Sequence, residues 1–295
     1  MSLQTPLSTA AMQPGHAVIA DRRFQHYEGD RMGVVYSFYA LYLHSIGWVL
    51  GHKRSSRYQI VPVLFLASAY LPAFGFIAFA AIPGLPVPRL WDFYGFTLPT
   101  IYIFLAITMP ELLCPDRRHG TLRMYMTSNL NPAAYLAAKL AAAWSVLGLV
   151  TLAPVLIMLA GYTLLGHGPA NVTDWFKTLG QVLASGLELA MFYGTIALAL
   201  SSLTDRNSFA AAGIFLTFVL SGVSLAILQG PLKAPEWVLL LNVNQLPDEL
   251  MLRTYQAPSG NPSTVPTWQL AAAAAGWVVA GIALLAFRYR GEGRK

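Results

Sequence analysis

The side chains that could do chemistry gather in one short segment in the first half of the chain. It contains two acids, two arginines, a histidine and the chain's single cysteine: Glu111, Asp116, Arg117, Arg118, His119 and Cys114. Acids beside an imidazole could transfer protons in an enzyme at a membrane surface, and the same charges could form a docking surface or a solvated loop. The six histidines of the chain show no paired spacing, so the sequence predicts no metal site.

One further carboxylate, Glu188, lies inside a long apolar run. A charge within a membrane helix costs roughly 2.5–3.5 kcal/mol on insertion scales, so we expect this side chain to face other helices and to have a partner. It could bind a proton, a cation or a transported substrate. It could equally be a protonated acid that is hydrogen-bonded to a neighbouring helix, for example through Tyr193 or a serine.

The composition places these groups in a membrane protein. Hydrophobic residues make up 56% of the 295 residues and charged residues only 11%, whereas soluble domains carry about 25% charge. The net charge of +6 comes from bases that lie beside apolar runs, which indicates membrane topology rather than nucleic-acid binding. The first 30 residues lack the pattern of a signal peptide, so we expect the first membrane segment to direct insertion.

Six apolar runs are long enough, or nearly so, to cross a bilayer core of about 30 Å as helices. They cover residues 60–82, 93–109, 142–165, 179–203, 209–228 and 268–287. Glu188 is the one charged residue within any of them. The sequence therefore predicts an all-α integral membrane protein with six transmembrane helices.

A seventh run, residues 33–50, could be another span or a helix at the membrane surface. Its aromatic residues, among them Tyr36, Tyr39 and Trp48, suit the headgroup region. With six spans and a cytoplasmic N-terminus, 15 basic residues lie inside and four outside; a seventh span changes these numbers to 12 and seven. The positive-inside rule thus favours six spans, both termini in the cytoplasm and an interfacial "elbow" helix at this run.

Four parts of the chain follow from this topology: a cytoplasmic lead (1–32), the elbow helix with a basic hinge (33–57), the six-span domain (58–290) and a cytoplasmic tail (291–295). The cytoplasmic connection 110–141 is expected to hold the charged segment as a turn, then an amphipathic helix capped by Thr121. Asn131 and Pro132 should end that helix and open the third span. The external connection 229–267 contains apolar pieces too short to cross, which could dip into the outer leaflet or pack over the bundle.

At the cytoplasmic connection the chain resembles the permease subunits of type-2 ABC transporters. The positions that match are Asp116, Arg117, Gly120, Thr121, Leu122, Pro132 and Lys139. Arg123 stands where an acid is common, and Asn129 lies near the usual helix-ending proline. The elbow, the six spans, the place of this connection after span two and the interrupted outer segment before span six extend the resemblance over residues 33–290.

The resemblance implies a transport subunit that is not an enzyme by itself. A coupling segment would dock on a separate cytoplasmic ATPase through Glu111, Asp116, Arg117, Arg118, His119, Gly120 and Thr121. The working unit would contain two such ATPases, which hold ATP and Mg, and two permeases, either identical or sisters. The chain itself has no GxxxxGK[ST] phosphate loop and is expected to bind no cofactor.

In this family, spans two and five commonly line the interface between permeases, which here would place Thr97 and Thr100 on the translocation pathway beside Glu188. The low charge of the chain favours a lipidic or amphipathic substrate, and the resemblance implies its export. The bacterial cytoplasmic membrane is the expected location. Two other functions remain open. One is an ion-coupled secondary transporter that uses Glu188, although the spans show no paired charges or repeats. The other is an intramembrane lipid-modifying enzyme that uses the cluster at residues 111–119.

Overall fold

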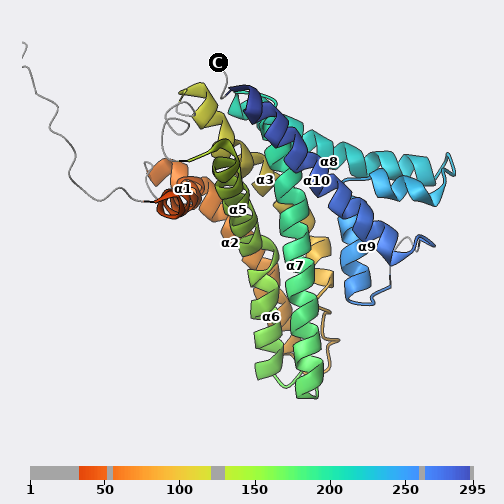
Figure 1. Cartoon of the computed structure of the whole chain (residues 1–295). Helices are drawn as coiled ribbons and strands as arrows, with labels where there is room; N and C mark the ends of the chain where they lie inside the picture. The colour runs from red at the N-terminus through yellow and green to blue at the C-terminus, as the bar shows by residue number, and fades with distance from the viewer. Residues whose placement is uncertain (1–32, 52–55, 121–129, 259–262, 293–295) are drawn as a thin grey trace, which may run out of the picture. The chain divides into compact units, whose positions relative to one another are not determined.

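The structure, a computed structural model, describes residues 33–51, 56–120, 130–258 and 263–292. All of these belong to one unit of the chain, Gly33–Lys295. Every regular element among the described residues is a helix, as the sequence predicted (Figure 1). In chain order these are α1 (Val34–Val49), α2 (Ser56–Ala80), α3 (Asp92–Arg118), α5 (Pro132–Thr151), α6 (Ala153–Leu164), α7 (Val172–Ser201), α8 (Asn207–Gln229), the 3-10 helix η1 (Glu236–Leu241), α9 (Gln245–Thr254) and α10 (Thr267–Glu292).

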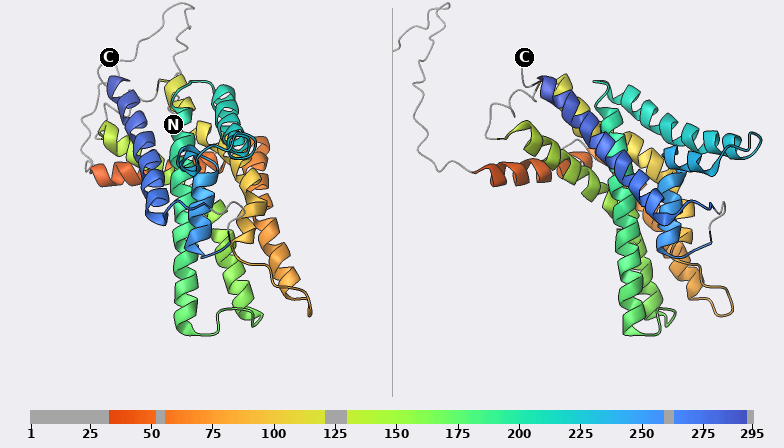
Figure 2. Two further views of the ribbon diagram at one scale, coloured as in Figure 1. Left: turned by 90° about the vertical axis from the view of Figure 1, so that its right-hand side faces the viewer. Right: turned by 45° about the vertical axis from the view of Figure 1, so that its right-hand side comes forward.

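Among the described residues, six helical stretches are long and apolar enough to cross a membrane: α2 from Pro62, α3, α5 with α6, α7, α8, and α10 to Arg290. This confirms the six predicted spans. α1 has 16 residues, which makes it about 24 Å long, shorter than a bilayer core of about 30 Å. Figure 2 shows α1 running crosswise to the long helix α7, the orientation that a helix in the membrane plane would have.

α7 is the central helix of the bundle and packs against α3, α5, α8, α9 and α10. Small residues permit these close approaches. A Cβ atom added at Gly186 of α7 would lie 2.9 Å from the side chain of Leu152, and one added at Gly281 of α10 would lie 2.8 Å from Cγ2 of Thr195. Membrane helices associate through such contacts because lipid offers them no hydrophobic driving force.

α3 does not end where the sequence predicted. Span two was expected to stop at Met109, with Pro110 opening a loop whose charged residues form a turn. The helix instead continues through Pro110 and Pro115 to Arg118. The side chains of residues 112–114 are buried in the bundle, and this burial offsets the backbone hydrogen bonds that the two prolines cannot donate. The charged residues therefore form the last turns of a rigid helix.

The connection between α8 and α10 packs on the bundle as η1 and α9. α9 lies against α7 and α10 and buries Leu246 and Met251. The amide of Asn242, just after η1, donates to the carbonyl oxygen of Ser221 in α8 over 2.6 Å. The short apolar pieces of this connection are thus helical. Leu239, Leu246 and Met251 are buried, whereas Trp237 and Leu241 of η1 are exposed.

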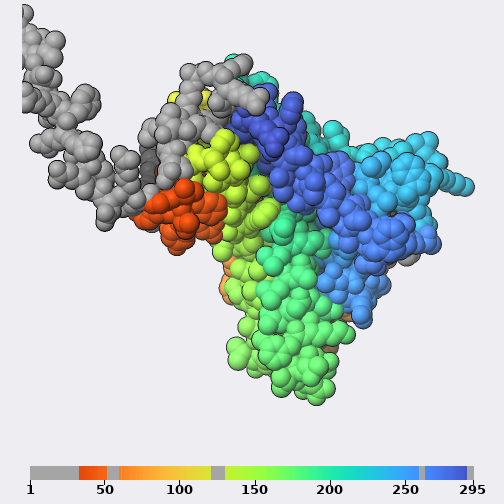
Figure 3. All heavy atoms as spheres, in the orientation of Figure 1, coloured from red at the N-terminus to blue at the C-terminus, as the bar shows by residue number. Residues whose placement is uncertain are grey.

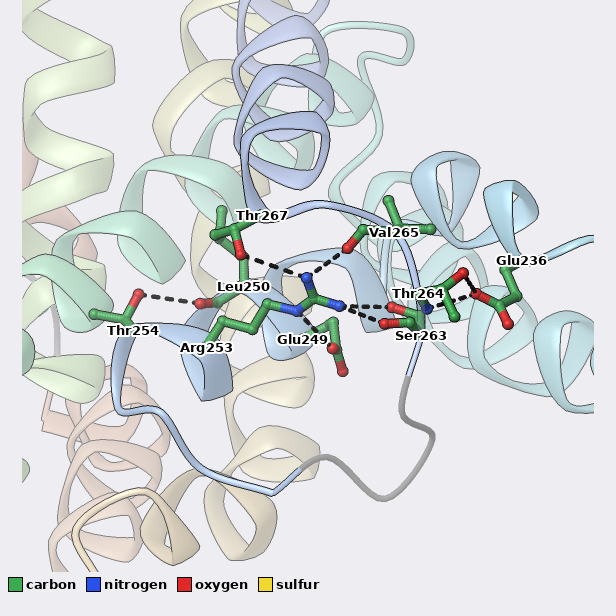
Figure 4. Close-up of polar contacts among 9 residues, drawn as sticks. All are labelled: Glu236, Glu249, Leu250, Arg253, Thr254, Ser263, Thr264, Val265 and Thr267. Carbon is green, nitrogen blue, oxygen red and sulfur yellow. Dashed lines mark hydrogen bonds and ion pairs between the residues drawn. The ribbon is translucent and has the colours of Figure 1, made fainter.

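Arg253, at the end of α9, forms hydrogen bonds with residues 263–267, which lead into α10 (Figure 4). Its guanidinium forms an ion pair with Glu249 at 3.0 Å and donates to the carbonyl oxygen of Ser263 at 2.8 Å. On the other side of this lead, the backbone N–H and the hydroxyl of Thr264 both donate to Glu236 at 2.6 Å. These hydrogen bonds hold the pKa of Glu236 below its ordinary value. The bonds of Arg253 also tie the end of α9 to the residues that lead into α10.

Candidate functional site

The charged end of α3 is closed by a glycine. His119 is the C-cap residue, and Gly120 follows it with a φ of +66°, a conformation that glycine adopts without strain. The N–H of Gly120 donates to the carbonyl oxygen of Arg117 over 3.2 Å. The chain turns away at this point and leads into residues 121–129. Those residues, which include Thr121 and the predicted coupling helix, lie outside the part of the chain that the structure describes.

α5 begins as predicted after this gap. Pro132 is its first residue, and the side chain of Asn131 accepts a hydrogen bond from the N–H of Ala134 over 2.7 Å. An asparagine at the N-cap followed by proline is a strong helix start, because the side chain satisfies a free N–H and proline needs none. The cap sets the rotation of α5, and that rotation decides which of its side chains face α3.

Asp116 of α3 is held by two side chains of α5. The ammonium group of Lys139 lies 2.8 Å from its carboxylate, and the hydroxyl of Tyr135 donates to the same oxygen over 2.7 Å. Only 5% of the Lys139 side chain and 16% of the Asp116 side chain are exposed. The structure therefore brings together two of the positions that carry the sequence resemblance. Because water is largely excluded here, removing either charge would leave the other buried and unpaired.

Arg117 joins α3 to the connection between α7 and α8. Its guanidinium lies 3.0 Å from the carboxylate of Asp205 and donates to the carbonyl oxygen of Ser202. One helical turn and a half earlier, Glu111 accepts a hydrogen bond from the amide of Asn207 over 2.9 Å. The end of α3 is thus bonded to α5 on one side and to the start of α8 on the other.

Arg118, His119 and Gly120 are the exposed members of the cluster. The Nδ1 atom of His119 lies 3.0 Å from the carbonyl oxygen of Pro115 in the last turn of α3, so its ring is held close to the helix end. The predicted docking residues consequently divide into two groups. Asp116 and Arg117 are bonded within the subunit, whereas Arg118 to Gly120 present their surface outward.

The elbow helix reaches this cluster. A cavity of about 170 Å³ lies between α1, α3 and α5, with His44 and Trp48 on one side and Glu111 and Asp116 on the other. α1 also packs along α5, where the hydroxyls of Tyr42 and Ser145 are 2.8 Å apart; Figure 3 shows the side chains of the two helices in contact. A displacement of the α3 end would therefore also displace α1.

The other aromatic residues predicted for the elbow lie nearer its beginning. Tyr36 and Tyr39 are each 56% exposed, and Trp48, at the far end, is half-buried in the wall of the cavity. Exposed tyrosines on a helix that runs crosswise to the spans match the pattern of side chains that settle among lipid headgroups. The interfacial position of α1 stays a prediction.

Glu188 occupies a second polar region, between α7, α3 and α9. One of its carboxylate oxygens is buried and has no hydrogen-bond partner within the described residues. The partner that the sequence suggested, Tyr193, donates its hydroxyl to the carbonyl oxygen of Asn244 instead, over 3.1 Å. The nearby serine, Ser185, bonds the hydroxyl of Tyr255 over 3.0 Å. Asp248 of α9 lies close enough to Glu188 for the two carboxyl groups to interact electrostatically.

Residues 54–287 match the family described as ABC-2 family transporter protein. This range extends from before α2 to the last turns of α10 and therefore takes in nearly all of the described bundle. The chain belongs to the ABC-2 transporter family. The resemblance inferred from the charged end of α3 is thereby confirmed. A comparison with curated proteins finds no match.

Because it belongs to the ABC-2 family, the chain is a multi-pass membrane protein and a transport subunit, and it is not an enzyme by itself. The lipid-modifying activity that the sequence left open is therefore set aside. Permeases of this family work with an ABC ATPase, so a charged and exposed helix end at a loop is a fitting candidate for the contact with that partner.

Spans two and five of this ABC-2 subunit, α3 and α8, pack side by side. Tyr102 of α3 stacks on Phe218 of α8 with ring centroids 5.0 Å apart. Thr97 is buried and its hydroxyl donates to Phe93 of its own helix over 2.9 Å, whereas Thr100 is partly exposed. The two predicted pathway residues thus differ: Thr97 belongs to the packed side of α3, and Thr100 keeps some free surface.

Sequence reasoning missed the residues that contact the cluster or Glu188 from other parts of the chain, among them Tyr135, Asp205 and Asp248. A signal existed for Tyr135, because Tyr135 and Lys139 are four residues apart and so share one face of α5. Asp205 and Asp248 lie in connections, where no helical period predicts which side chains meet.

Proposed function

We propose that this chain is the permease subunit of an ABC exporter, and that a separate cytoplasmic ATPase docks on the end of α3. The observation that carries this proposal is the division of the charged cluster. Its outer members, Arg118 to Gly120, are exposed, while Asp116 and Arg117 bond the same helix end to α5 and to the start of α8. A helix end that is exposed on one side and bonded to other spans on the other can pass a displacement into the bundle.

The proposed mechanism begins in the partner. ATP and Mg bind to the ATPase pair, and closure of that pair displaces the segment that follows Gly120. The Asp116–Lys139 pair transfers the displacement to α5, and the Arg117–Asp205 pair transfers it to the start of α8. α1 follows because it packs on both α3 and α5. The pathway between two permeases then opens to the outside.

The proposed partner within the membrane is a second permease, either a copy of this chain or a sister. α8 buries only a few of its side chains, namely Ala210, Ile214, Phe218 and Leu225, and leaves most of its apolar surface uncovered. A Cβ at Gly213, on the uncovered side, would meet nothing within 4 Å. A small residue on an open helix face allows a second helix to approach closely, which supports α8 and its neighbour α3 as the surface between permeases.

The positive-inside rule supports the proposed orientation. The end of the bundle that carries the α3 terminus, the start of α8 and the end of α10 (top of Figure 1) also carries five described arginines. These are Arg117, Arg118, Arg206, Arg288 and Arg290. We place this end in the cytoplasm of a bacterial cell, with the loop between α6 and α7 outside and both chain termini inside.

The test is affinity purification of the tagged chain from its native membrane in mild detergent. We expect a stoichiometric ATPase to accompany the unchanged chain. A double variant, Arg118→Glu with His119→Glu, reverses the exposed charge and should lose the ATPase while the permease stays monodisperse. Arg290→Glu is the matched control, since Arg290 is also exposed at this end of the bundle but lies on α10. A permease that never brings down an ATPase contradicts the proposal.

Ion-coupled transport is the second candidate function, and one observation favours it. The buried carboxylate oxygen of Glu188 lacks a hydrogen bond within the described residues, as a residue that takes up and releases a proton would between steps. The corresponding test is proton flux into liposomes that contain the permease alone. Flux that Glu188→Gln abolishes would establish this function, and its absence would remove it.

A further inference from the structure

A second cavity lies at the end of the bundle opposite the charged α3 terminus. Its volume is about 780 Å³, and its walls come from the end of α2, the connection between α2 and α3, the start of α3, and α9. Pockets that hold drug-sized ligands measure roughly 300–1,000 Å³. The cavity is thus large enough for a whole small amphipathic molecule.

Most of the cavity wall is aromatic or aliphatic. Phe76 and Phe96 meet edge to face with ring centroids 5.4 Å apart, and Trp91 and Met251 complete the surface beside them. Phe96 is 68% exposed, and Phe79, another lining residue, is 54% exposed. Apolar side chains that remain exposed on spanning helices would face lipid, so a ligand could enter sideways from the membrane.

Asp248 is the charged residue that α9 contributes to this wall. It is half-buried and makes no hydrogen bond or ion pair with any described residue. Its neighbour Glu249 already forms an ion pair with Arg253 at 3.0 Å, and that guanidinium is further engaged by the lead into α10. A carboxylate that is partly removed from water without a counter-charge is costly, and a bound cation would offset that cost.

The remaining charges around the cavity leave it negative. Asp92 lines the same wall and accepts a hydrogen bond from the backbone N–H of Arg89 over 2.9 Å. The guanidinium of Arg89 lies over the ring of Trp91, 5.2 Å from its centroid, and its side chain is exposed at the rim. Glu188 adds a further carboxyl group close to Asp248. Among the described residues that line the cavity, one cation, Arg89, thus accompanies two carboxylates, Asp92 and Asp248.

We propose that this cavity binds an amphipathic cation, whose apolar body lies among Phe76, Phe96 and Met251 and whose positive group lies beside Asp248. Aromatic faces attract cations as well as apolar groups, so the lining suits both parts of such a molecule. The proposal rests on the proposed export function, because it names the chemical class of the compound that the permease carries. An organic anion of the same shape would meet the carboxylates and should be rejected.

The test uses the purified full-length chain in a nonionic maltoside detergent, without ATPase. Equilibrium dialysis compares labelled tetraphenylphosphonium, an apolar cation, with tetraphenylborate, an anion of nearly the same size. We expect saturable binding of the cation and at least about tenfold weaker binding of the anion, since one charge contact is worth roughly that factor. Equal binding of the two probes would overturn the proposal, and this comparison requires no variant.

Variants assign the binding to Asp248. Asp248→Asn should weaken cation binding by about tenfold, and Asp248→Glu should restore most of it. Asp174→Asn is the matched control, because Asp174 is an exposed carboxylate at the start of α7, outside the cavity. Cation binding that is unchanged in a folded Asp248→Asn protein would place the ligand elsewhere and overturn the assignment.

Two further comparisons distinguish this proposal from binding of a lipid headgroup and from the proposed ATPase-coupled function. Short-chain phosphatidylcholine added to the dialysis should not displace the cation; displacement would assign the cavity to a lipid headgroup and overturn the assignment to a free amphipath. The dialysis is also independent of the ATPase. Loss of ATPase association with retained cation binding would contradict only the proposed function, and the reverse would contradict only the cavity.

Discussion

Asp116 and Arg117 were predicted from the sequence to contact the ATPase, and their surroundings suggest a different use of their charges. Each is bonded to another segment of the same chain, Asp116 to Lys139 and Arg117 to Asp205. The exposed residues Arg118 and His119 are better placed to meet a partner protein. We therefore separate two roles at the residue scale: contact with the ATPase and transmission within the permease.

The Asp116–Lys139 pair gives the first prediction. Asp116→Asn leaves the nearly buried Lys139 without its counter-charge and should lower the free energy of unfolding by about 3 kcal/mol. Thermal or denaturant unfolding of the permease in detergent measures this change. Exchange of the two residues, Asp116→Lys with Lys139→Asp, should recover part of the stability. An Asp116→Asn permease of unchanged stability that no longer binds the ATPase would instead mean that Asp116 contacts the partner directly.

Asp248 gives a prediction on pH. Burial, and secondly the charge of Glu249, raise the pKa of Asp248 from 3.8 to about 6. The folded protein therefore holds this proton more tightly than the unfolded chain, and the stability of the ligand-free protein should fall as the pH rises from about 4 to about 6. Binding of tetraphenylphosphonium should change in the opposite sense, because only the ionised carboxylate attracts a cation.

Dialysis at pH 5 and pH 7.5 measures the change in cation binding. The other titratable groups near Asp248 come from its own helix, from α7, and from α3 and the connection before it. They are Glu249, Glu188, Tyr193, Tyr102, Asp92 and Arg89. Asp248→Asn should remove most of the pH dependence. Dependence that persists in this variant would point to one of those neighbours.

At the scale of helices, the elements that the sequence predicted are those whose signal is local. Each span is a long apolar run, and the start of α5 carries a cap in Asn131 and Pro132. The end of α3 was predicted wrongly, because Pro110 is a local signal to stop and the burial of residues 112–114 depends on distant parts of the chain. A local sequence pattern does not show whether other helices will pack against a segment and stabilise it.

The same reasoning applies to the candidate site. The sequence predicted the charged cluster and Glu188, because charges are rare in this chain. It could not predict which side chains would meet, since Asp116 and Tyr135 are 19 residues apart along the chain. The proximity of Asp248 to Glu188 depends on how α9 packs against α7, and helix packing is a tertiary property.

Packing of α10 on α7 gives the third prediction. Gly281→Ala would place a Cβ 2.8 Å from Cγ2 of Thr195, whose side chain is buried and whose hydroxyl accepts a hydrogen bond from Trp144 over 3.0 Å. Overpacking of this kind costs about 1–3 kcal/mol. Gly276→Ala on the same helix is the control, since a Cβ there meets nothing within 4 Å.

Both alanines gain similar helix propensity, so the difference between the two variants isolates the contact with α7. Unfolding in detergent measures both. Equal stability of the two variants would mean that α7 and α10 separate readily. α10 could then not follow a movement of the central helix.

At the scale of the whole molecule, the two candidate sites lie at opposite ends of the bundle and are connected by α3. The helix carries the charged cluster at one end and, at the other, Asp92 and Phe96 of the large cavity. A shift of its charged end would therefore reach the cavity directly, because both lie on one continuous helix. We therefore expect transport to depend on an unbroken α3, whose three prolines, Pro99, Pro110 and Pro115, all lie inside the helix.

The last prediction concerns the second permease. If α8 and α3 form the surface between two copies of this chain, a cysteine at Gly213 should cross-link one copy to another in native membranes. The natural cysteine, Cys114, is buried and should add no background. Phe287→Cys is the control, because Phe287 is 80% exposed on α10, a helix outside the proposed surface. Dimers seen on a non-reducing gel with Gly213→Cys alone would support the arrangement.

The alternatives give different patterns. Cross-links from Phe287→Cys and none from Gly213→Cys would place the interface at α10 and not at α8 and α3. Cross-links of Gly213→Cys to a different protein would identify a sister permease. If ATP analogues that close the ATPase pair change the yield at Gly213, then the α3 end and the α8 surface respond to one movement. That response is expected because α3 is bonded to this part of the chain twice. Arg117 contacts Asp205 in the connection before α8, and Glu111 contacts Asn207, the first residue of α8.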